Sequence, residues 1–429
     1  MLVVAGLILL PAAPALGAQA ATVAADPVPT ETGPFTGAGF YTPPTVLPRD
    51  NGAVIRYQDS AVGYLGVLAK RIMYKSTDVH GNAVAVTGTV LQPTAPWTGG
   101  GDRPLVSYAV GTIGQGDQCA PSILLNQGLE YEALSLSPIL AAGVAVVVTD
   151  YLGLGTPDRV HSYLNRADEA HAVLDAALAA QDLSRNVPGV DIPAEGPVGI
   201  YGYSQGGQAA GAAAELQPTY AQQLHLVGSA IGAPPADLAS VAAGGDGTIL
   251  SGALGYAING FIQDYPQLAT QFHALLNQRG NDFITAVKGE CLAETVLRFG
   301  FQQSRIYTVS GLPFTSFLGV EPFKSIIAEQ RVGGLAPTAP VYIWQGRNDD
   351  AVPFAQSLQL AKDWCAQGAT VKFKEYGFPA ILPGAGIGHV LPFALGLFEA
   401  QGWLYERFAV AAAGGTTPAP NSCGALPSA

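Results

Sequence analysis

The sequence predicts an α/β fold in which a mostly parallel, doubly wound sheet carries an inserted helical subdomain. Short β-rich runs alternate along the chain with stretches of helical spacing, the pattern of strand–helix–strand units. The run at 143–150 is apolar almost throughout, as expected for a parallel strand covered on both faces. Between about 236 and 336 this alternation stops and helical patterns dominate.

Length and composition indicate a globular protein with a large core. The 429 residues suffice for two average domains or for one large domain with an insertion. Hydrophobic residues make up 48% of the chain and charged residues 12%, which excludes intrinsic disorder. The formal charge of −12 argues against nucleic acid or an anionic membrane surface as a partner. We expect a monomer.

The first 20 residues are typical of a secretory signal peptide. The apolar run Met1–Leu10 is followed by Ala18-Gln19-Ala20, a small-residue cleavage pattern. No Lys or Arg precedes Arg49, so the usual positive segment is missing. No other stretch offers the ~18 uninterrupted apolar residues of a membrane span. We therefore expect a secreted protein without a stable span.

Four cysteines follow the predicted signal: Cys119, Cys291, Cys365 and Cys423. An even number in an oxidising compartment predicts two disulfides, and the sequence leaves all three pairings open. A zinc site is the competing interpretation, but no Cys-x-x-Cys pair supports it. We predict no metal site.

Before residue 202 the sequence predicts an irregular arm followed by a series of strands and helices. A Pro-, Thr- and Gly-rich arm at 21–50 is expected to lie irregularly on the body. The further predictions are a hairpin of strands 69–75 and 83–91, a strand at 104–110, helices near 124–134 and 138–142, a strand at 143–150, a helix at 162–183 and a strand at 197–201.

After residue 206 the predicted order continues with a helix, a strand at 225–232 and the helical segment 236–336. The sheet then resumes with strands at 340–346 and 370–376 around a helix at 355–367, and a last helix covers 392–410. We divide the chain into a core, 21–235 with 337–429, and a helical insertion, 236–336.

The stretch Gly202-Tyr203-Ser204-Gln205-Gly206 lies between a strand and a helix. In the nucleophile elbow of α/β-hydrolases, glycines on both sides of the nucleophile allow the sharp turn that exposes its Oγ. A chain with 53 glycines and 19 serines forms Gly-x-Ser-x-Gly by chance about 0.3 times, so the motif alone is weak. Its strand–turn–helix context makes Ser204 the candidate nucleophile.

A serine nucleophile needs a base, and the base needs an acid, which follow in the order Ser, Asp or Glu, His in this fold. His389 follows the last predicted strand in a Gly-rich loop, where the base is expected. Asp349 and Asp350 leave the carboxyl end of the strand at 340–346, the edge where α/β active sites gather. We assign the acid to Asp349, although either residue could instead cap the next helix.

The loop 111–119 follows an early strand and is rich in glycine. α/β-hydrolases place one oxyanion-hole donor in such a loop, but a simple tight turn has the same composition. Elsewhere, His80 is interpreted as a turn residue and His171 as a surface or core residue of its helix.

In combination, these motifs resemble the secretory lipase family typified by Candida antarctica lipase A, in its actinobacterial branch. The blocks extend in order over some 280 residues, which makes the resemblance more specific than any single motif. They are Gly111-Thr112-x-Gly114, Asp117-Gln118-Cys119-Ala120-Pro121-Ser122, Asp150-Tyr151-x-Gly153-Leu154-Gly155-Thr156, Gly202-Tyr203-Ser204-Gln205-Gly206-Gly207, Gly232-Ala233-Pro234-Pro235-Ala236-Asp237-Leu238, Asp349-Asp350-x-Val352-Pro353 and Gly388-His389.

The resemblance implies a secreted α/β-hydrolase that has a helical lid and cleaves carboxylic esters such as acylglycerols, at a lipid–water interface, without metal or organic cofactor. We therefore expect the insertion, 236–336, to act as a lid that binds an acyl chain. It implies Ser204 as nucleophile, Asp349 as acid and His389 as base. The N–H groups of Thr112 and Gln205 are the implied oxyanion donors. It also implies that Cys119 pairs with Cys291, and Cys365 with Cys423.

Two other functions remain open at this stage. Serine exopeptidases share the fold and the triad, although the inserted segment shows no cluster of charges to hold a peptide terminus. A non-catalytic surface or binding protein is the second, and the intact set of Ser204, Asp349 and His389 argues against it.

Overall fold

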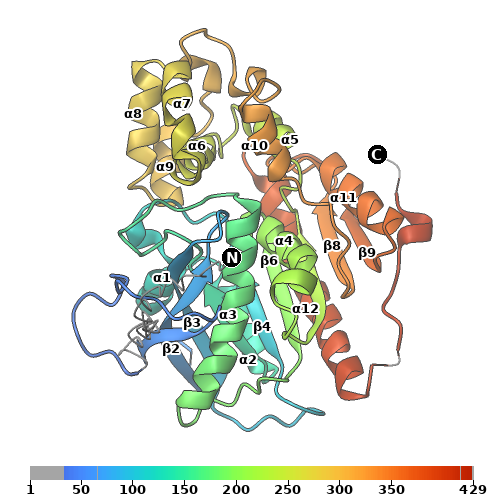
Figure 1. Cartoon of the computed structure of the whole chain (residues 1–429). Coiled ribbons are helices and arrows are strands. Elements are labelled where there is room, and N and C mark those ends of the chain that lie inside the picture. The colour runs from blue at the N-terminus through green and yellow to red at the C-terminus, as the bar shows by residue number, and fades with distance from the viewer. Residues whose placement is uncertain (1–32, 65, 416, 428–429) are drawn as a thin grey trace, which may run out of the picture.

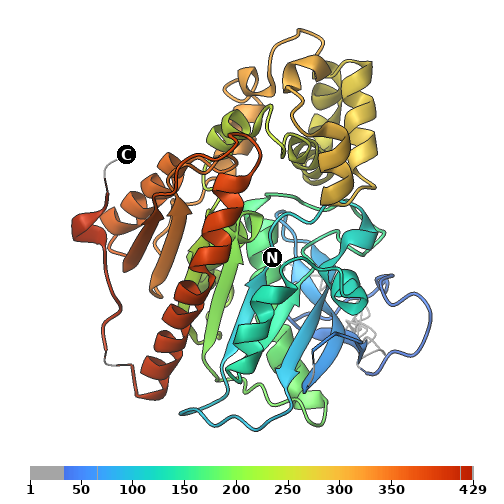
Figure 2. The same ribbon diagram turned by 180° about the vertical axis from the view of Figure 1, so that it is seen from behind.

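The computed structural model describes residues 33–64, 66–415 and 417–427. The predicted signal peptide, 1–20, lies outside these residues. A central sheet has helices on both faces, and a group of helices lies beyond one end of its strands (Figure 1). α3 (Arg166–Asn186), α4 (Gln205–Tyr220) and α11 (Phe354–Ala366) cover the face turned to the viewer in Figure 1, and α1 (Pro121–Gln127), α2 (Ala133–Ala141) and α12 (Ile387–Ala412) cover the opposite face (Figure 2).

In the described part of the chain, nine strands form one sheet in the order β1-β2-β3-β5-β4-β6-β7-β8-β9. Pairing is antiparallel from β1 to β5 and parallel from β5 to β9. The strands are β1 (Val54–Asp59), β2 (Val67–Thr77), β3 (Ala83–Pro93), β4 (Leu105–Ala109), β5 (Ala145–Thr149), β6 (Val198–Tyr203), β7 (Leu226–Gly232), β8 (Val341–Gly346) and β9 (Val371–Tyr376). The predicted doubly wound, mostly parallel sheet is confirmed.

The helices packed on the sheet follow from local sequence. In α3 the side chain of Asn165 caps the N-terminus by accepting from the N–H groups of Ala167 and Asp168. α4 presents small Gly and Ala residues, all buried, so it can lie close to the strands. These helices are α1 (Pro121–Gln127), α2 (Ala133–Ala141), α3 (Arg166–Asn186), α4 (Gln205–Tyr220), α11 (Phe354–Ala366) and α12 (Ile387–Ala412).

The segment between β7 and β8 is helical and has its own hydrophobic core. Tyr256, Phe261 and Phe283 are buried there, and Tyr163 and Leu164 from the segment before α3 join the same cluster. The segment follows β7 in the chain, so it leaves from the carboxyl end of that strand. Its helices are α5 (Leu238–Gly245), α6 (Ala253–Asp264), α7 (Ala269–Leu275), α8 (Gln278–Val287), α9 (Leu292–Phe299) and α10 (Phe323–Glu329).

Three local features differ from the sequence-based expectation. The helix predicted near 124–134 is interrupted, because Gly128, with φ of 72°, ends α1 and α2 begins only at Ala133. β1 was not anticipated; it is a six-residue edge strand next to the irregular arm, too short to give a clear alternating pattern. The last helix begins at Ile387, not at 392, because Pro392 is accommodated inside α12. From sequence alone a proline favours the start of a helix, where its missing N–H costs nothing. As a result His389 lies in the first turn of α12, not in the preceding loop.

Two disulfides are formed, Cys119–Cys291 and Cys365–Cys423, the pairs that the resemblance implies. The first joins the loop after β4 to the start of α9, and Leu292 N–H donates to the Ile113 carbonyl beside it at 2.9 Å. It therefore links the core to the helical segment.

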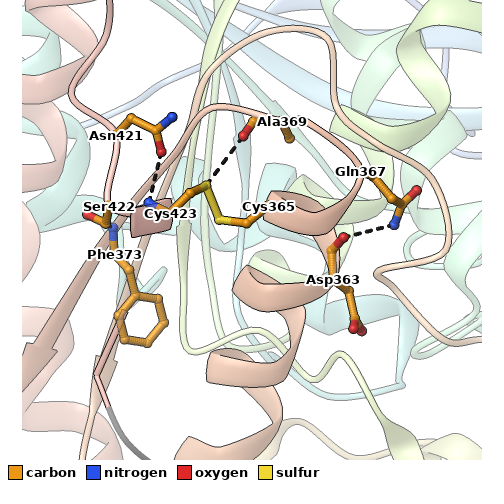
Figure 3. The surroundings of a disulfide bond; sticks show 8 residues. All are labelled: Asp363, Cys365, Gln367, Ala369, Phe373, Asn421, Ser422 and Cys423. Carbon is orange, nitrogen blue, oxygen red and sulfur yellow. Dashed lines mark hydrogen bonds between the residues drawn. A yellow bond between two sulfur atoms is a disulfide. The ribbon is translucent and has the colours of Figure 1, made fainter. Parts of the chain in front are cut away.

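The second disulfide fixes the C-terminal tail on α11 (Figure 3). Beside it, Ser422 N–H donates to the Val371 carbonyl at 2.6 Å, and Phe373 N–H donates to Ser422 Oγ at 3.1 Å. The tail thus pairs with the outer edge of β9, a strand edge that is otherwise open to association with other chains.

We predict that replacing both Cys365 and Cys423 by serine destabilises the protein and loosens the tail. Closing a loop with a sequence separation of 58 restricts the unfolded chain, and loss of the bond should lower the free energy of unfolding. The chain-entropy estimate for such a loop is about 4 kcal/mol. Thermal unfolding and hydrogen exchange of β9 measure the effect. An unchanged melting temperature under non-reducing conditions would contradict it.

Candidate active site

Ser204 lies at the sharp turn between β6 and α4. Its φ of 60° and ψ of −125° are strained for a residue with a side chain. The flanking glycines are required by close approach: a Cβ on Gly202 would lie 2.1 Å from the Gly206 carbonyl oxygen, and one on Gly206 would lie 2.0 Å from the Ala109 oxygen. The motif therefore adopts the strand–turn–helix geometry expected from its sequence.

A chain of hydrogen bonds starts at Ser204. Its Oγ lies 2.8 Å from His389 Nε2, and His389 Nδ1 lies 2.8 Å from Asp349 Oδ2. An ionised carboxylate can only accept, so Nδ1–H donates to it and leaves Nε2 free to accept from the serine hydroxyl. The structure brings together the three residues that the sequence analysis selected, from the ends of β6 and β8 and the start of α12.

The carboxylate of Asp349 is fully buried and held by several donors. Oδ1 accepts from the N–H groups of Ala351 and Val352 at 2.9 and 2.8 Å, and Oδ2 accepts from Gln345 Nε2 at 2.8 Å. These donors fix the orientation of the carboxylate toward the imidazole. Gln345 was missed by the sequence analysis because a glutamine inside a β-strand carries no motif.

Asp350 has a different position. Its Oδ2 accepts from Gly386 N–H at 2.9 Å and so holds the turn that begins α12. The two neighbouring aspartates therefore have different partners. Asp349 contacts the imidazole of His389, and Asp350 contacts the backbone near that residue.

The charges around His389 favour its protonated form. Burial of the imidazole lowers its pKa, but the charge and hydrogen bond of Asp349, with the charges of Asp350 and Glu132, outweigh this, so the pKa of His389 is raised. The neutral form, which can accept a proton, predominates at pH values above that raised pKa. A buried glutamate near the imidazole, Glu132, was not anticipated from the sequence.

Thr112 and Gln205 both lie next to Ser204. Gln205 is the first residue of α4, where N–H groups have no partner within the helix. Thr112 follows β4, and its carbonyl accepts from the Tyr131 hydroxyl at 3.2 Å, while its Oγ1 lies 2.7 Å from the hydroxyl of Tyr163. Thr112 and Ser204 line the same pocket, and the oxyanion role of the Thr112 and Gln205 N–H groups stays a prediction.

A pocket with about 1250 Å³ of open space, including solvent at its mouth, extends from Ser204 and Thr112 into the helical segment. Apart from these two residues and Tyr163, its lining is entirely apolar or glycine. α5, α6, α7 and α10 supply most of it, with residues such as Val241, Ala257 and Ile326. This pocket can hold a long apolar group with one end at the serine.

Within the described residues, no group of three or more His, Cys, Asp or Glu side chains is arranged to hold a metal ion. None of their helices combines the length and the hydropathy needed to cross a membrane.

Solved structures with this fold include known hydrolases. A closed-state structure of Candida antarctica lipase A matches with a TM-score of 0.75 and 22% identity, covering 91% of each chain. A rice cell wall degrading esterase from Xanthomonas oryzae matches with a TM-score of 0.71 and 20% identity, covering 84% of this chain and 100% of the esterase. At these identities the likeness concerns the fold.

Sequence comparison identifies relatives of higher sequence identity. A protein of Mycobacterium tuberculosis named as a probable inactive lipase is 27% identical over 387 residues, 86% of this chain and 81% of its own. A secreted triacylglycerol lipase of Malassezia furfur is 29% identical over 317 residues, 71% of this chain and 78% of its own. The family model for secretory lipases matches residues 120–415. Because this match spans well over half of the chain, the protein is an α/β-hydrolase that belongs to the secretory lipase family.

Proposed function

We propose that this secreted enzyme hydrolyses carboxylic esters of lipids, acylglycerols among them, by an acyl-enzyme mechanism with Ser204 as nucleophile, His389 as base and Asp349 as acid. The observation that carries the proposal is the continuous chain of hydrogen bonds from Ser204 Oγ through His389 to Asp349, at the end of an apolar pocket. All three residues belong to one chain, so a monomer suffices.

In the first half of the reaction, Ser204 Oγ attacks the ester carbonyl carbon while its proton passes to His389 Nε2. The carbonyl oxygen becomes an oxyanion, which accepts from the N–H groups of Gln205 and Thr112. The intermediate then expels the alcohol, which takes the proton from His389, and the acyl group remains on Ser204.

In the second half, water attacks the acyl carbon and gives its proton to His389. Collapse releases the carboxylic acid and returns the proton to Ser204, so one ester and one water yield one acid and one alcohol. Asp349 keeps Nδ1 protonated throughout and stabilises the imidazolium that forms in each half.

We further propose that residues 236–336 form a lid and acyl-binding subdomain on the hydrolase core, 21–235 with 337–429. The separate hydrophobic cluster of the helical segment supports this division. α5, α6, α7 and α10 line the pocket above Ser204, where they can exclude water and bind an acyl chain. Substrate would enter from a lipid–water interface.

The alternatives are less well supported. An exopeptidase would have to neutralise a charged peptide terminus, and no charged residue lines the pocket. A non-catalytic role is raised by the mycobacterial relative named as inactive. The hydrogen-bonded Ser204, His389 and Asp349 favour catalysis instead.

The direct test of the proposal is Ser204→Ala. We expect ester hydrolysis to fall by roughly 10³- to 10⁶-fold with an unchanged fold, because the members of a triad act as a unit. Hydrolysis of p-nitrophenyl esters and emulsified triacylglycerol, with circular dichroism as the control of folding, measures this. Normal turnover by a folded Ser204→Ala protein would refute the nucleophile and the mechanism.

The two aspartates should respond differently to removal of charge. Asp349→Asn should lower kcat by roughly 10³- to 10⁴-fold, because the tautomer of His389 is lost. Asp350→Asn should keep most of the activity. Since the Asp350 charge raises the pKa of His389, its loss should shift the acidic limb of the kcat/KM profile to lower pH. A larger loss in Asp350→Asn than in Asp349→Asn would reverse the assignment.

The acyl-binding role predicts a preference for longer chains. Each buried CH₂ contributes about 0.8 kcal/mol, or nearly fourfold, so kcat/KM should rise from acetyl to octanoyl esters. Ala257→Phe in the pocket should shorten the preferred chain, whereas Ala293→Phe, on the exposed surface of α9, should not. If acetyl esters are best and the two variants give the same profile, the helical segment only covers the core.

A further inference from the structure

Glu169, in the first turn of α3, is a buried carboxyl group that the mechanism above does not use. Its side chain reaches the residue that follows the nucleophile: Oε1 accepts from Gln205 Nε2 at 2.8 Å. The same oxygen accepts from Leu164 N–H at 2.9 Å. Glu169 and Gln205 are each 1% exposed, so water does not compete for these bonds.

The second hydrogen of the Gln205 amide is bound as well. His161 Nδ1 lies 2.9 Å from the Leu152 carbonyl oxygen, which can only accept, so Nδ1 carries the proton. His161 Nε2 is then an acceptor, and Gln205 Nε2 lies 3.0 Å from it. Burial lowers the pKa of His161 to about 4, which keeps the ring neutral and this direction of bonding fixed. Both amide hydrogens of Gln205 are therefore occupied by buried acceptors.

These bonds hold two strained pieces of backbone together. Ser204 and Leu164 both have φ of 60°, and such conformations persist only when their surroundings enforce them. Gln205 directly follows Ser204, and Glu169 accepts from the N–H of Leu164. Leu164 also lines the pocket beside Ser204.

The neighbouring residue extends the connection to the other proposed oxyanion donor. The hydroxyl of Tyr163 lies 2.7 Å from Thr112 Oγ1. The segment 161–164 thus contacts Gln205 through His161, Thr112 through Tyr163, and Glu169 through Leu164. This buried segment therefore connects the two residues proposed as oxyanion donors with the wall of the acyl pocket.

We propose that Glu169 is a positioning residue of the oxyanion hole: by binding the Gln205 side chain and the Leu164 backbone, it holds the Gln205 N–H at the oxyanion and the pocket wall beside it. This inference rests on the proposed function, in which Ser204 is acylated. Glu169 does not contact the reacting atoms; it acts through Gln205.

The charge of Glu169 gives the positioning role a pH dependence. Burial, with a smaller contribution from the charge of Asp168, raises the pKa of Glu169 to about 8, although its bonds to Gln205 and Leu164 lower it. The nearby hydroxyls of Tyr151 and Tyr163 have pKa values raised by burial and stay neutral. Oε2 is buried without a partner, which suits an uncharged acid. At neutral pH Glu169 is therefore mostly uncharged, and its negative charge develops as the pH rises through about 8.

The test compares two substitutions at Glu169 with a control on the same helix. Glu169→Asp retracts the carboxyl group by one methylene and should lower kcat for a p-nitrophenyl ester by about 10- to 100-fold, less than loss of a whole oxyanion donor. KM should change little. We expect kcat of the unmodified enzyme to fall as the pH rises above about 8, where Glu169 becomes charged. Glu169→Gln stays uncharged, so it should keep activity at pH 7 within a few-fold and show no such fall.

Asp175→Asn is the matched control, because Asp175 is another buried carboxyl group of α3, bound by Ser76 and Tyr220 away from the site. It should lower thermal stability without lowering kcat. Active-site titration with a phosphonate ester measures the fraction of the protein that has a reactive Ser204. If Glu169→Asp titrates fully but has a low kcat, the defect is one of positioning and the proposed nucleophile still stands.

A double-mutant cycle with Gln205→Leu decides whether Glu169 acts through Gln205. If it does, Glu169→Asp lowers kcat much less in the Gln205→Leu background than in the unmodified enzyme. An equal loss in both backgrounds overturns the inference. So does a loss of kcat in Asp175→Asn as large as that in Glu169→Asp, because the defect would then reflect general loosening of α3.

Discussion

The strained turn at Ser204 is the constraint on which the rest of the active site depends. A serine with φ of 60° is unfavourable by itself and is enforced by a helix and a sheet that meet with almost no space between them. The parallel strands on both sides of β6 and the small residues of α4 provide that close contact. The proposed nucleophile is therefore presented by a buried strand and a largely buried helix, which leave it little freedom to move.

The carboxyl edge of the sheet collects the other groups because parallel strands all end there. β4 leads into Thr112, β8 into Asp349, and the turn after β9 into His389. The helical segment leaves from the same edge and covers it, so that an apolar pocket ends at a polar site. An ester fits this arrangement, since its acyl chain is apolar and its carbonyl group needs donors.

Behind the site lies a second layer of buried polar residues. Glu169 and His161 bind Gln205, Gln345 binds Asp349, and Glu132 accepts from Gly111 N–H at 2.7 Å next to Thr112. Each buried polar group must find a partner or weaken the fold, and here the partners are the residues adjacent to the reacting atoms. Stability of the core and precision of the site are thus maintained by the same bonds.

The sequence by itself determined the parts of this protein that depend on local patterns. Apolar periodicity predicted the alternating strands and helices, and the glycines around Ser204 predicted the elbow, because both signals lie within a few consecutive residues. The start of α12 was predicted too late in the chain because Pro392 was interpreted from the adjacent sequence alone, whereas the packed helix accommodates this proline. Only the tertiary structure decided which of Asp349 and Asp350 reaches His389, because neighbouring side chains on a loop point in different directions. It alone joined Glu169, His161 and Tyr163 to the site, since these contacts connect residues 36 to 51 positions apart that share no motif.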